Sequence, residues 1–261
     1  SCIYASDLAY RPRFEQGRVE DGKTVCIKRP FAAEKERLSK LDLADDVYGK
    51  AVEWCRELGM KSMVTVFSRN RISQMAALGW DAVKVASYDC ASLPFLKQLA
   101  DAFPFLVVST GATFENEIVE AAKLLAKKPF AMLHCTTVYP TQADLVNLRK
   151  MAWLRDIAPS VGFSDHSPVM ETGINASLIA LWLGADYIER HFTILPADMT
   201  RDGKVSIGPD HVRQLVKFAG MDKGQQLDFI KKQIPDYERY IGSGTLELSD
   251  EELLNRDYYR G

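Results

Sequence analysis

Short apolar runs alternate with longer amphipathic stretches along the chain from Lys61 onward. The apolar runs predict six strands, at residues 62–67, 82–86, 105–109, 131–135, 160–163 and 186–189. Between them apolar residues recur at helical spacing, and two helices are predicted at residues 115–127, after a Thr113-x-x-Asn116 start, and 173–183. Strands that alternate with helices in this way are typical of βα units, so the pattern predicts an α/β protein with a parallel sheet.

Polar side chains cluster where the predicted strands end. The clusters are Thr65, Lys84, Ser87, Ser109 and residues 134–137, 164–166 and 189–191. A closed barrel brings the carboxyl ends of all its strands to one face, whereas an open doubly wound sheet gathers binding groups at one switch point. No glycine-rich dinucleotide or nucleoside-triphosphate loop supports the open sheet. The sequence therefore predicts a TIM (β/α)8 barrel.

The N-terminal part of the chain does not resemble two further βα units. Residues 2–5 and 25–28 could supply short strands, but Pro12, Gly17 and many charges lie between them without an apolar helical face. We interpret residues 1–32 as an irregular loop with room for a hairpin, followed by a capped helix at about 44–58. The barrel is therefore expected to lack its first two strands in this chain.

The C-terminal part of the chain changes in composition after a helix predicted at residues 212–218. Residues 231–261 carry many charges, Pro235 and Gly242-Ser-Gly244, with little apolar periodicity. We therefore interpret residues 1–230 as the N-terminally incomplete TIM barrel and residues 231–261 as a linker or tail.

Charge and cysteine content exclude several classes of protein. The 261 residues include 33 basic and 35 acidic ones, for a net charge of −2, so no footprint for nucleic acid or an anionic membrane is present. The five cysteines lie far apart and form neither a C-x-x-C pair nor a disulfide framework. No stretch approaches the roughly 20 apolar residues that a membrane span needs. We expect a soluble, cytoplasmic protein that acts on a small molecule.

Two of the four histidines follow consecutive predicted strands, in Ser164-Asp165-His166 and Glu189-Arg190-His191. Imidazole is a good ligand for Mn²⁺, Fe²⁺ or Zn²⁺, and two histidines would leave positions open for a substrate oxygen and water. The alternative is that each histidine caps its own strand or helix by hydrogen bonding.

Two further segments could bind an anion. Lys84 is flanked by apolar residues in a predicted strand and needs an anionic partner, either a substrate phosphate or carboxylate or a neighbouring Asp81 or Asp89. Ser109-Thr-Gly-Ala112 runs from a strand into a small turn whose amides could hold an oxyanion, although an ordinary capped turn has the same sequence.

The segment from His134 to Pro140 places hydroxyls and an aromatic ring just after a predicted strand, which suits binding of a sugar. Cys135 next to His134 could suggest a nucleophile pair, but adjacent residues of a strand point to opposite faces. We therefore interpret His134 as a core or supporting residue.

Six segments in series resemble the sialic acid (N-acetylneuraminate) synthase family, which includes legionaminic and pseudaminic acid synthases and spore-coat polysaccharide synthase relatives. They are Lys84-Val-Ala-Ser-Tyr-Asp89, Ser109-Thr-Gly-Ala112, Leu133-His-Cys-Thr-Thr-Val-Tyr-Pro140, Gly162-Phe-Ser-Asp-His166, Gly184-Ala-Asp-Tyr-Ile-Glu-Arg-His-Phe-Thr193 and Gly208-Pro-Asp-His211. Together they cover about residues 60–215.

The resemblance implies an enzyme that condenses phosphoenolpyruvate with an N-acylated amino-sugar aldehyde and releases phosphate. It implies a divalent metal, Mn²⁺ with Mg²⁺ or Co²⁺ as alternatives, held by His166 and His191. Residues implied in binding phosphoenolpyruvate are Thr65, Lys84, Ser87, Ser109, Thr137 and Ser164. Asp89 would act on the sugar or a catalytic water, and Phe67, Tyr139 and Asp210 would contact the sugar.

The chain departs from the family in four places. Arg190 stands where a lysine is usual, and extra residues at 195–206 precede Gly208, which affects the assignment of Asp210. The family's first two strands are not recognisable, so the chain would begin just after them, or Lys28 would replace the second strand's lysine. The C-terminal domain of relatives is not recognisable either, and the expected homodimer would form without it.

Two other functions fit the same residues. A different metal-dependent barrel aldolase could use the histidines and the anion site on a 2-oxo acid without phosphoenolpyruvate. A catalytically incomplete synthase fragment could keep these residues in a structural role.

Overall fold

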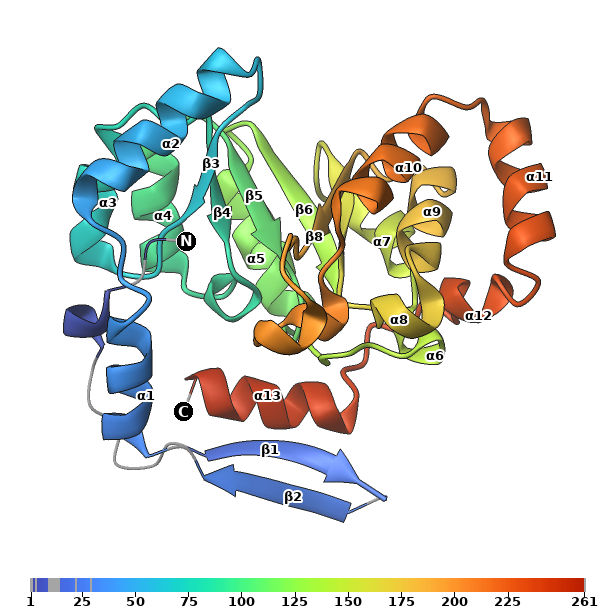
Figure 1. Ribbon diagram of the computed structural model, residues 1–261, viewed down its shortest axis with the longest axis horizontal. Helices are drawn as coiled ribbons and strands as arrows, with labels where there is room; N and C mark the ends of the chain where they lie inside the picture. The colour runs from blue at the N-terminus through green and yellow to red at the C-terminus, as the bar shows by residue number, and fades with distance from the viewer. Residues whose placement is uncertain (1, 3, 9–14, 22, 29, 261) are drawn as a thin grey trace. The chain divides into compact units, whose positions relative to one another are not determined.

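The computed structural model describes residues 2, 4–8, 15–21, 23–28 and 30–260, with side chains described outside 15–20, 24, 26–28 and 257–260. Six strands form a sheet whose strand order follows the chain (Figure 1). They are β3 (Met63–Thr65), β4 (Ala82–Val85), β5 (Leu106–Ser109), β6 (Phe130–Cys135), β7 (Val161–Asp165) and β8 (Tyr187–Arg190). All six predicted strands are thereby confirmed. The closed eight-stranded barrel stays a prediction.

The chain divides into two compact units. The first contains residues 1–108, 113–130 and 248–261, and the second contains residues 109–112 and 131–247.

In the first unit, β3 pairs with β4 and β4 with β5, both in parallel register. Its helices are α2 (Asp45–Glu57), α3 (Ile72–Ala76), α4 (Leu93–Ala102) and α5 (Glu115–Leu125). Parallel strands are covered on both faces, and Val83, Val85 and Leu106 are accordingly buried. Helix α5 begins at Glu115 as predicted and ends two residues earlier than predicted. Its N-cap is Phe114, whose amide donates to Glu117, whereas Thr113 Oγ1 donates to the Ser87 carbonyl.

The N-terminal segment of the first unit contains the predicted hairpin, with β1 (Glu15–Glu20) and β2 (Lys23–Lys28) antiparallel. The same segment contains the helical turn η1 (Ala5–Asp7), and α1 (Phe31–Ser39) follows the hairpin. A second helical turn, η2 (Arg69–Arg71), follows β3. Cys2 forms an isolated parallel bridge with Val66, with its amide 2.6 Å from the Thr65 carbonyl. Lys28, proposed above as a replacement lysine, has a side chain that lies outside the described ones.

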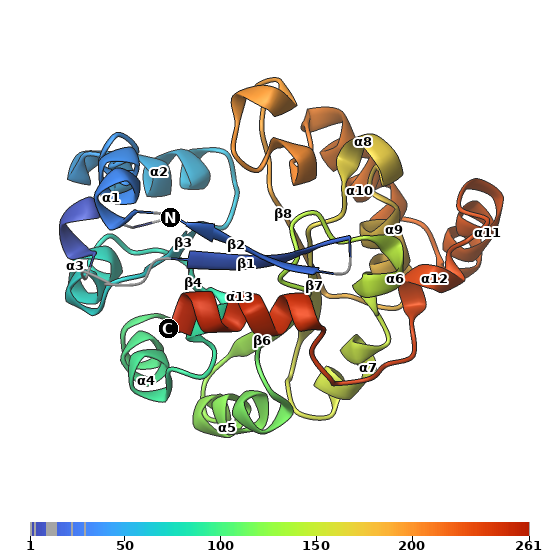
Figure 2. The ribbon, with the colours of Figure 1, turned by 90° about the horizontal axis from the view of Figure 1, so that it is seen from below.

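Helix α13 (Asp250–Arg260) lies beside β1 in the first unit (Figure 2). Arg256 anchors it, since both terminal nitrogens of its guanidinium bind the Glu117 carboxylate at 2.6 and 2.8 Å. The same guanidinium lies over the Phe114 ring, 4.2 Å from its centroid. The stretch interpreted as a linker thus contains helices, α13 and α12 (Glu238–Ile241), and the linker role itself stays a prediction.

In the second unit, β6 pairs with β7 and β7 with β8, again in parallel. Its remaining elements are α6 (Ala143–Val146), α7 (Lys150–Arg155), α8 (Val169–Thr172), α9 (Asn175–Trp182), η4 (Ala197–Met199), η5 (Gly203–Val205), α10 (Pro209–Ala219) and α11 (Lys223–Gln233). The helices predicted at 173–183 and 212–218 correspond to α9 and α10. Strand β7 approaches β8 closely at Gly162, where a Cβ atom would lie 2.4 Å from the Tyr187 carbonyl oxygen.

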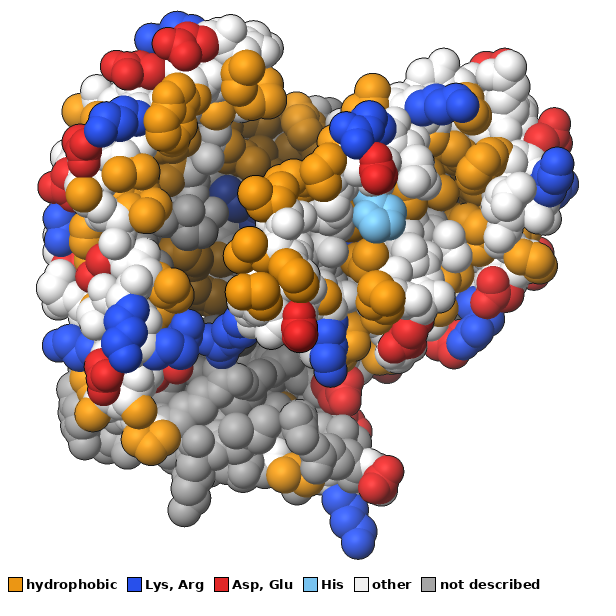
Figure 3. Space-filling view, viewed as in Figure 1, with side chains coloured by type: hydrophobic (Ala, Val, Ile, Leu, Met, Phe, Trp, Pro, Cys, Tyr) orange, Lys and Arg blue, Asp and Glu red, His pale blue; other side chains and the backbone are white. Residues whose placement is uncertain are grey.

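Hydrophobic side chains are also visible on the molecular surface (Figure 3). In the second unit, the loop after β8 exposes Phe192, Ile194, Leu195 and Met199. Within the described residues, no helix combines the length and the apolar character needed to cross a bilayer.

Candidate metal and substrate site

The ends of β7 and β8 bring two imidazole rings together in the second unit. Asp165 and Arg190 are register partners at the ends of β7 and β8, and the residue that follows each strand is a histidine. The ring centroids of His166 and His191 lie 5.4 Å apart. The Tyr139 ring lies 4.0 Å from that of His166 and 6.0 Å from that of His191. The expectation that the two imidazoles meet is therefore confirmed.

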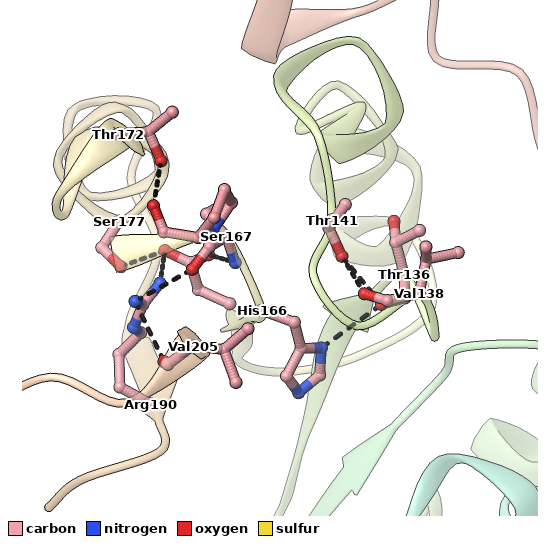
Figure 4. Close-up of polar contacts among 11 residues, drawn as sticks. Thr136, Val138, Thr141, His166, Ser167, Thr172, Ser177, Arg190 and Val205 are labelled. Carbon is pink, nitrogen blue, oxygen red and sulfur yellow. Dashed lines mark hydrogen bonds and ion pairs between the residues drawn. The ribbon is translucent and has the colours of Figure 1, made fainter. Parts of the chain in front are cut away.

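His166 is held as a neutral imidazole. Its side chain is buried, and burial together with the nearby His191 lowers its pKa to about 4. Its Nδ1 lies 3.3 Å from the Thr136 carbonyl oxygen, so this nitrogen carries the hydrogen and donates it. Figure 4 shows the ring directed toward Thr136. The Nε2 lone pair is left for another partner, as metal ligation requires.

His191 is half-buried and faces a carboxylate that sequence reasoning did not assign. Its Nδ1 lies 3.7 Å from Oδ2 of Asp202, just before η5 in the 195–206 segment. A carboxylate at this nitrogen favours the tautomer with hydrogen on Nδ1, which is how ligating histidines are oriented. Asp202 could not be found from sequence, because its approach depends on the path of a loop.

A buried ion pair lies directly before the two histidines. Arg190 Nη1 is 2.5 Å from Asp165 Oδ2, and both side chains are almost fully buried. Ser177 Oγ and the Ser167 amide donate to the same carboxylate at 2.5 and 2.8 Å. Burial alone would raise the pKa of Asp165, but Arg190 and these donors outweigh it and hold the pKa below its usual value.

Other predicted site residues of the second unit are distributed between the interior and the surface. Ser109, Thr137 and Ser164 are buried at strand ends, and Ser109 Oγ has no hydrogen-bond partner among the described residues. Tyr139 is about half exposed beside the histidines. Asp210 is exposed at the start of α10 and pairs with Arg213 at 2.5 Å. The structure thus gives Asp210 a surface ion pair, and its contact with a sugar stays a prediction.

The predicted anion-binding residues of the first unit gather on β3 and β4. Thr65 and Lys84 are register partners, and Lys84 is 6% exposed, with its Nζ donating to the Val85 carbonyl at 2.9 Å. Asp81, one alternative partner for Lys84, instead accepts from the Ser62 amide at 2.8 Å and from Lys61 at 3.2 Å.

The helical turn η3 (Ser87–Asp89) follows β4 directly and contains two more predicted site residues. Ser87 is buried, whereas Asp89 is half-buried. Between them, the Tyr88 ring stacks on Phe67 at a centroid distance of 6.0 Å. Their roles toward a substrate stay predictions.

His134 lies in the core, as its sequence context suggested. It is buried and its Nε2 donates to the Val146 carbonyl at 2.7 Å. Burial lowers its pKa to about 4. Cys135, the neighbour of His134 in sequence, lies near His166, with its Sγ 3.9 Å from His166 Nδ1.

The donor set of His166 and His191 fits a divalent metal ion. One ring is neutral and buried, and the Nδ1 atoms of both rings face oxygen atoms, which leaves both Nε2 atoms as ligands. No cluster of three or more histidine, cysteine or acidic residues that could hold a metal is found among the described residues. Two imidazoles leave coordination positions open to which substrate oxygens and water could bind.

Comparisons with known proteins find relatives that match over most of the chain. Residues 23–222 match the model of the NeuB family. An N,N'-diacetyllegionaminic acid synthase of Campylobacter jejuni is 31% identical over 231 residues, which are 86% of this chain and 64% of that protein. The corresponding enzyme of Legionella pneumophila is also 31% identical, and 60% of its length is covered. The chain thus spans somewhat under two thirds of these relatives.

Solved structures agree on the fold. The spore coat polysaccharide biosynthesis protein SpsE of Bacillus subtilis has a TM-score of 0.66 at 28% identity, covering 78% of this chain and 57% of that one. An N-acetylneuraminic acid synthetase of Leptospira borgpetersenii has the same TM-score at 24% identity, covering 87% and 74%.

Proposed function

Because the chain belongs to the NeuB family, we propose that it condenses phosphoenolpyruvate with the open-chain aldehyde of an N-acylated amino sugar and releases phosphate. The observation that carries this proposal is the pair of imidazoles at the ends of β7 and β8, 5.4 Å apart, with His166 kept neutral by burial. Mn²⁺ is the metal that the family resemblance implies, and the positions that two imidazoles leave open would take the oxygen ligands that suit Mn²⁺.

In the proposed reaction, C3 of phosphoenolpyruvate forms a bond with the aldehyde carbon, and the aldehyde oxygen takes up a proton. Water then adds to C2, and the C–O bond to phosphate breaks, so that phosphate leaves with the bridging oxygen. A divalent ion held by His166 and His191 would polarise the aldehyde oxygen.

The protein's own groups bind and orient the reactants. Lys84 supplies a fixed positive charge for a phosphate or carboxylate, and its burial strengthens that attraction relative to water. Thr65 and Ser87 supply hydroxyl donors beside it in the first unit, and Ser109, Thr137 and Ser164 do so at strand ends in the second. Tyr139, with about half of its surface exposed, offers a ring face to a sugar.

Asp89 is proposed to accept a proton from the attacking water or to bind a sugar hydroxyl. It is half-buried at the end of η3, where a carboxylate can contact both a substrate and solvent. Phe67, stacked on Tyr88, and Asp210 are proposed as further sugar contacts.

The test is to incubate the purified protein with Mn²⁺, phosphoenolpyruvate and a panel of N-acetylated amino sugars, and to follow product mass and free phosphate. A nonulosonic acid should form together with one phosphate per product, and His166→Gln should abolish both. Lys84→Met should raise the KM for phosphoenolpyruvate, whereas Lys97→Met, which removes an exposed lysine of α4, should leave it unchanged. Product formed when a 2-oxo acid such as pyruvate replaces phosphoenolpyruvate would instead identify an aldolase, and the proposal would be wrong.

A further inference from the structure

The residues that precede the two histidines form a buried contact across the β7–β8 ladder. Asp165 and Arg190 are register partners, with the carboxylate and guanidinium 2.5 Å apart and side chains 0% and 3% exposed. Each is covalently one residue from a candidate metal ligand. A movement of either side chain would therefore be transmitted to the backbone that carries an imidazole.

Both members of the pair are held by further elements. Asp165 accepts from Ser177 of α9 and from the amide of Ser167, the residue on the other side of His166. Arg190 Nη2 donates to the Val205 carbonyl at 3.2 Å and lies 3.5 Å from the Ser167 carbonyl. Figure 4 shows Ser177, Ser167, Val205 and Arg190 gathered around this contact, with His166 directed away from it. The pair thus connects β7, β8, α9 and η5.

Stability alone is a poor explanation for such a contact. A buried ion pair loses the hydration of two charges, and apolar residues of similar volume often stabilise a protein equally well or better. Here the desolvation is not fully compensated, because Arg190 Nε and Nη1 are both buried and have no hydrogen-bond partner among the described residues. The short contact of Nη1 with Asp165 is therefore an attraction between opposite charges without hydrogen-bond geometry. What the ion pair provides and an apolar pair would not is an attraction between two register partners, each of which is also held by hydrogen bonds to other elements: Asp165 by Ser177 and the Ser167 amide, and Arg190 by the Val205 carbonyl.

We propose that Asp165 and Arg190 are positioning residues, which hold the backbone on both sides of His166 and directly before His191 so that the two imidazoles share one metal ion. This inference rests on the proposed function, because the proposed function requires the two imidazoles to bind one metal ion. Ligand geometry must be held to a fraction of an ångström for tight metal binding, and supporting contacts provide that precision.

The test replaces the whole pair, in Asp165→Asn/Arg190→Met, so that no buried charge is left alone. The matched control is Asp186→Asn/Arg155→Met, which removes an ion pair of 3.5 Å between α7 and the residue preceding β8, at the opposite end of the same ladder. We expect Mn²⁺ affinity, measured by electron paramagnetic resonance, to fall about 10–100-fold in the first variant and to stay unchanged in the control. The melting temperature of the first variant should not fall in parallel.

Two single substitutions cover the case in which the double variant does not fold. Arg190→Lys keeps the charge opposite Asp165 and should bind Mn²⁺ more tightly than Arg190→Met. Equal Mn²⁺ affinity in the lysine and methionine variants, or wild-type affinity in a folded double variant, would show that the pair is only structural.

Metal-free crystal structures separate this inference from the proposed function. The positioning role predicts that the ring separation of His166 and His191 changes in the double variant and not in the control. If the wild-type protein binds no Mn²⁺, the proposed function is wrong. If the separation of the His166 and His191 rings is the same in the double variant as in the wild type, the positioning role is wrong as well.

Discussion

Replacing His134 with glutamine should make the stability of the protein less dependent on pH. The pKa of His134 is lowered from 6.5 to about 4, first by burial and then by Lys150, although its bond to the Val146 carbonyl opposes the shift. The folded state therefore holds a neutral ring that the unfolded chain protonates below pH 6.5. Between these values the unfolded state binds more protons, so stability falls as the pH falls.

The magnitude follows from the two pKa values. One pKa unit corresponds to about 1.4 kcal/mol, so the neutral ring accounts for about 3 kcal/mol of pH-dependent stability, fully present above pH 6.5. About 2 kcal/mol of it should be lost by about pH 5. Glutamine can keep the hydrogen bond to Val146 but does not titrate.

The assay is urea unfolding of wild-type protein and His134→Gln at about pH 7.5 and pH 5. We expect the free energy of unfolding of the wild type to fall by about 2 kcal/mol more than that of the variant between these two pH values. Equal losses in both proteins would refute the reasoning, because they would mean that His134 titrates in the folded state as it does in the unfolded chain.

Three further predictions concern other parts of the molecule. Gly162→Ala places a Cβ 2.4 Å from the Tyr187 carbonyl oxygen and should destabilise the protein by about 1–3 kcal/mol in urea unfolding. As a control, Gly49→Ala in α2 places a Cβ at an ordinary contact distance of 3.9 Å from Leu78 and should stabilise the protein by about 1 kcal/mol. Equal effects of the two substitutions would contradict the close approach of β7 and β8. Arg256→Met removes the anchor of α13 and should speed amide hydrogen exchange in that helix, with unchanged exchange arguing against the anchor. Asp202→Asn should weaken Mn²⁺ binding about tenfold by releasing His191, and unchanged affinity would exclude this orienting role.

Much of the sheet was predictable from sequence, because β5, β6 and β7 are buried along their whole length and consist largely of apolar residues. The prediction stopped short at the end of β7, which continues through Ser164 and Asp165 beyond the predicted end at residue 163. Polar residues normally argue against a buried strand. Here Arg190 compensates the charge of Asp165, and that partner lies on another strand.

The C-terminal helices were harder to predict from apolar periodicity. Helix α11 has a capping signal instead, since the Gln225 amide donates to the Asp222 side chain at 2.9 Å. Helix α13 begins in the same way, because the Ser249 amide donates to the Glu252 carboxylate and the Glu252 amide donates to Ser249 Oγ, both at 3.3 Å. Counting capping pairs as well as apolar spacing would have identified both helices.

The site could be predicted as far as it depends on strand order. His166 and His191 follow adjacent parallel strands, and their proximity could be expected before any coordinates. The contacts of Arg190 with Asp165 and of Asp202 with His191 could not be predicted, because they depend on side-chain direction and on the path of a loop.

The most direct test of the account is a Mn²⁺ titration of the metal-free protein, followed by electron paramagnetic resonance. We predict one Mn²⁺ site that is lost in His166→Gln and in His191→Gln and retained in His211→Gln, because His211 accepts a bond from the Gly208 amide and lies in α10. Equal Mn²⁺ affinity in all four proteins would contradict the assignment of the imidazole pair as the metal site.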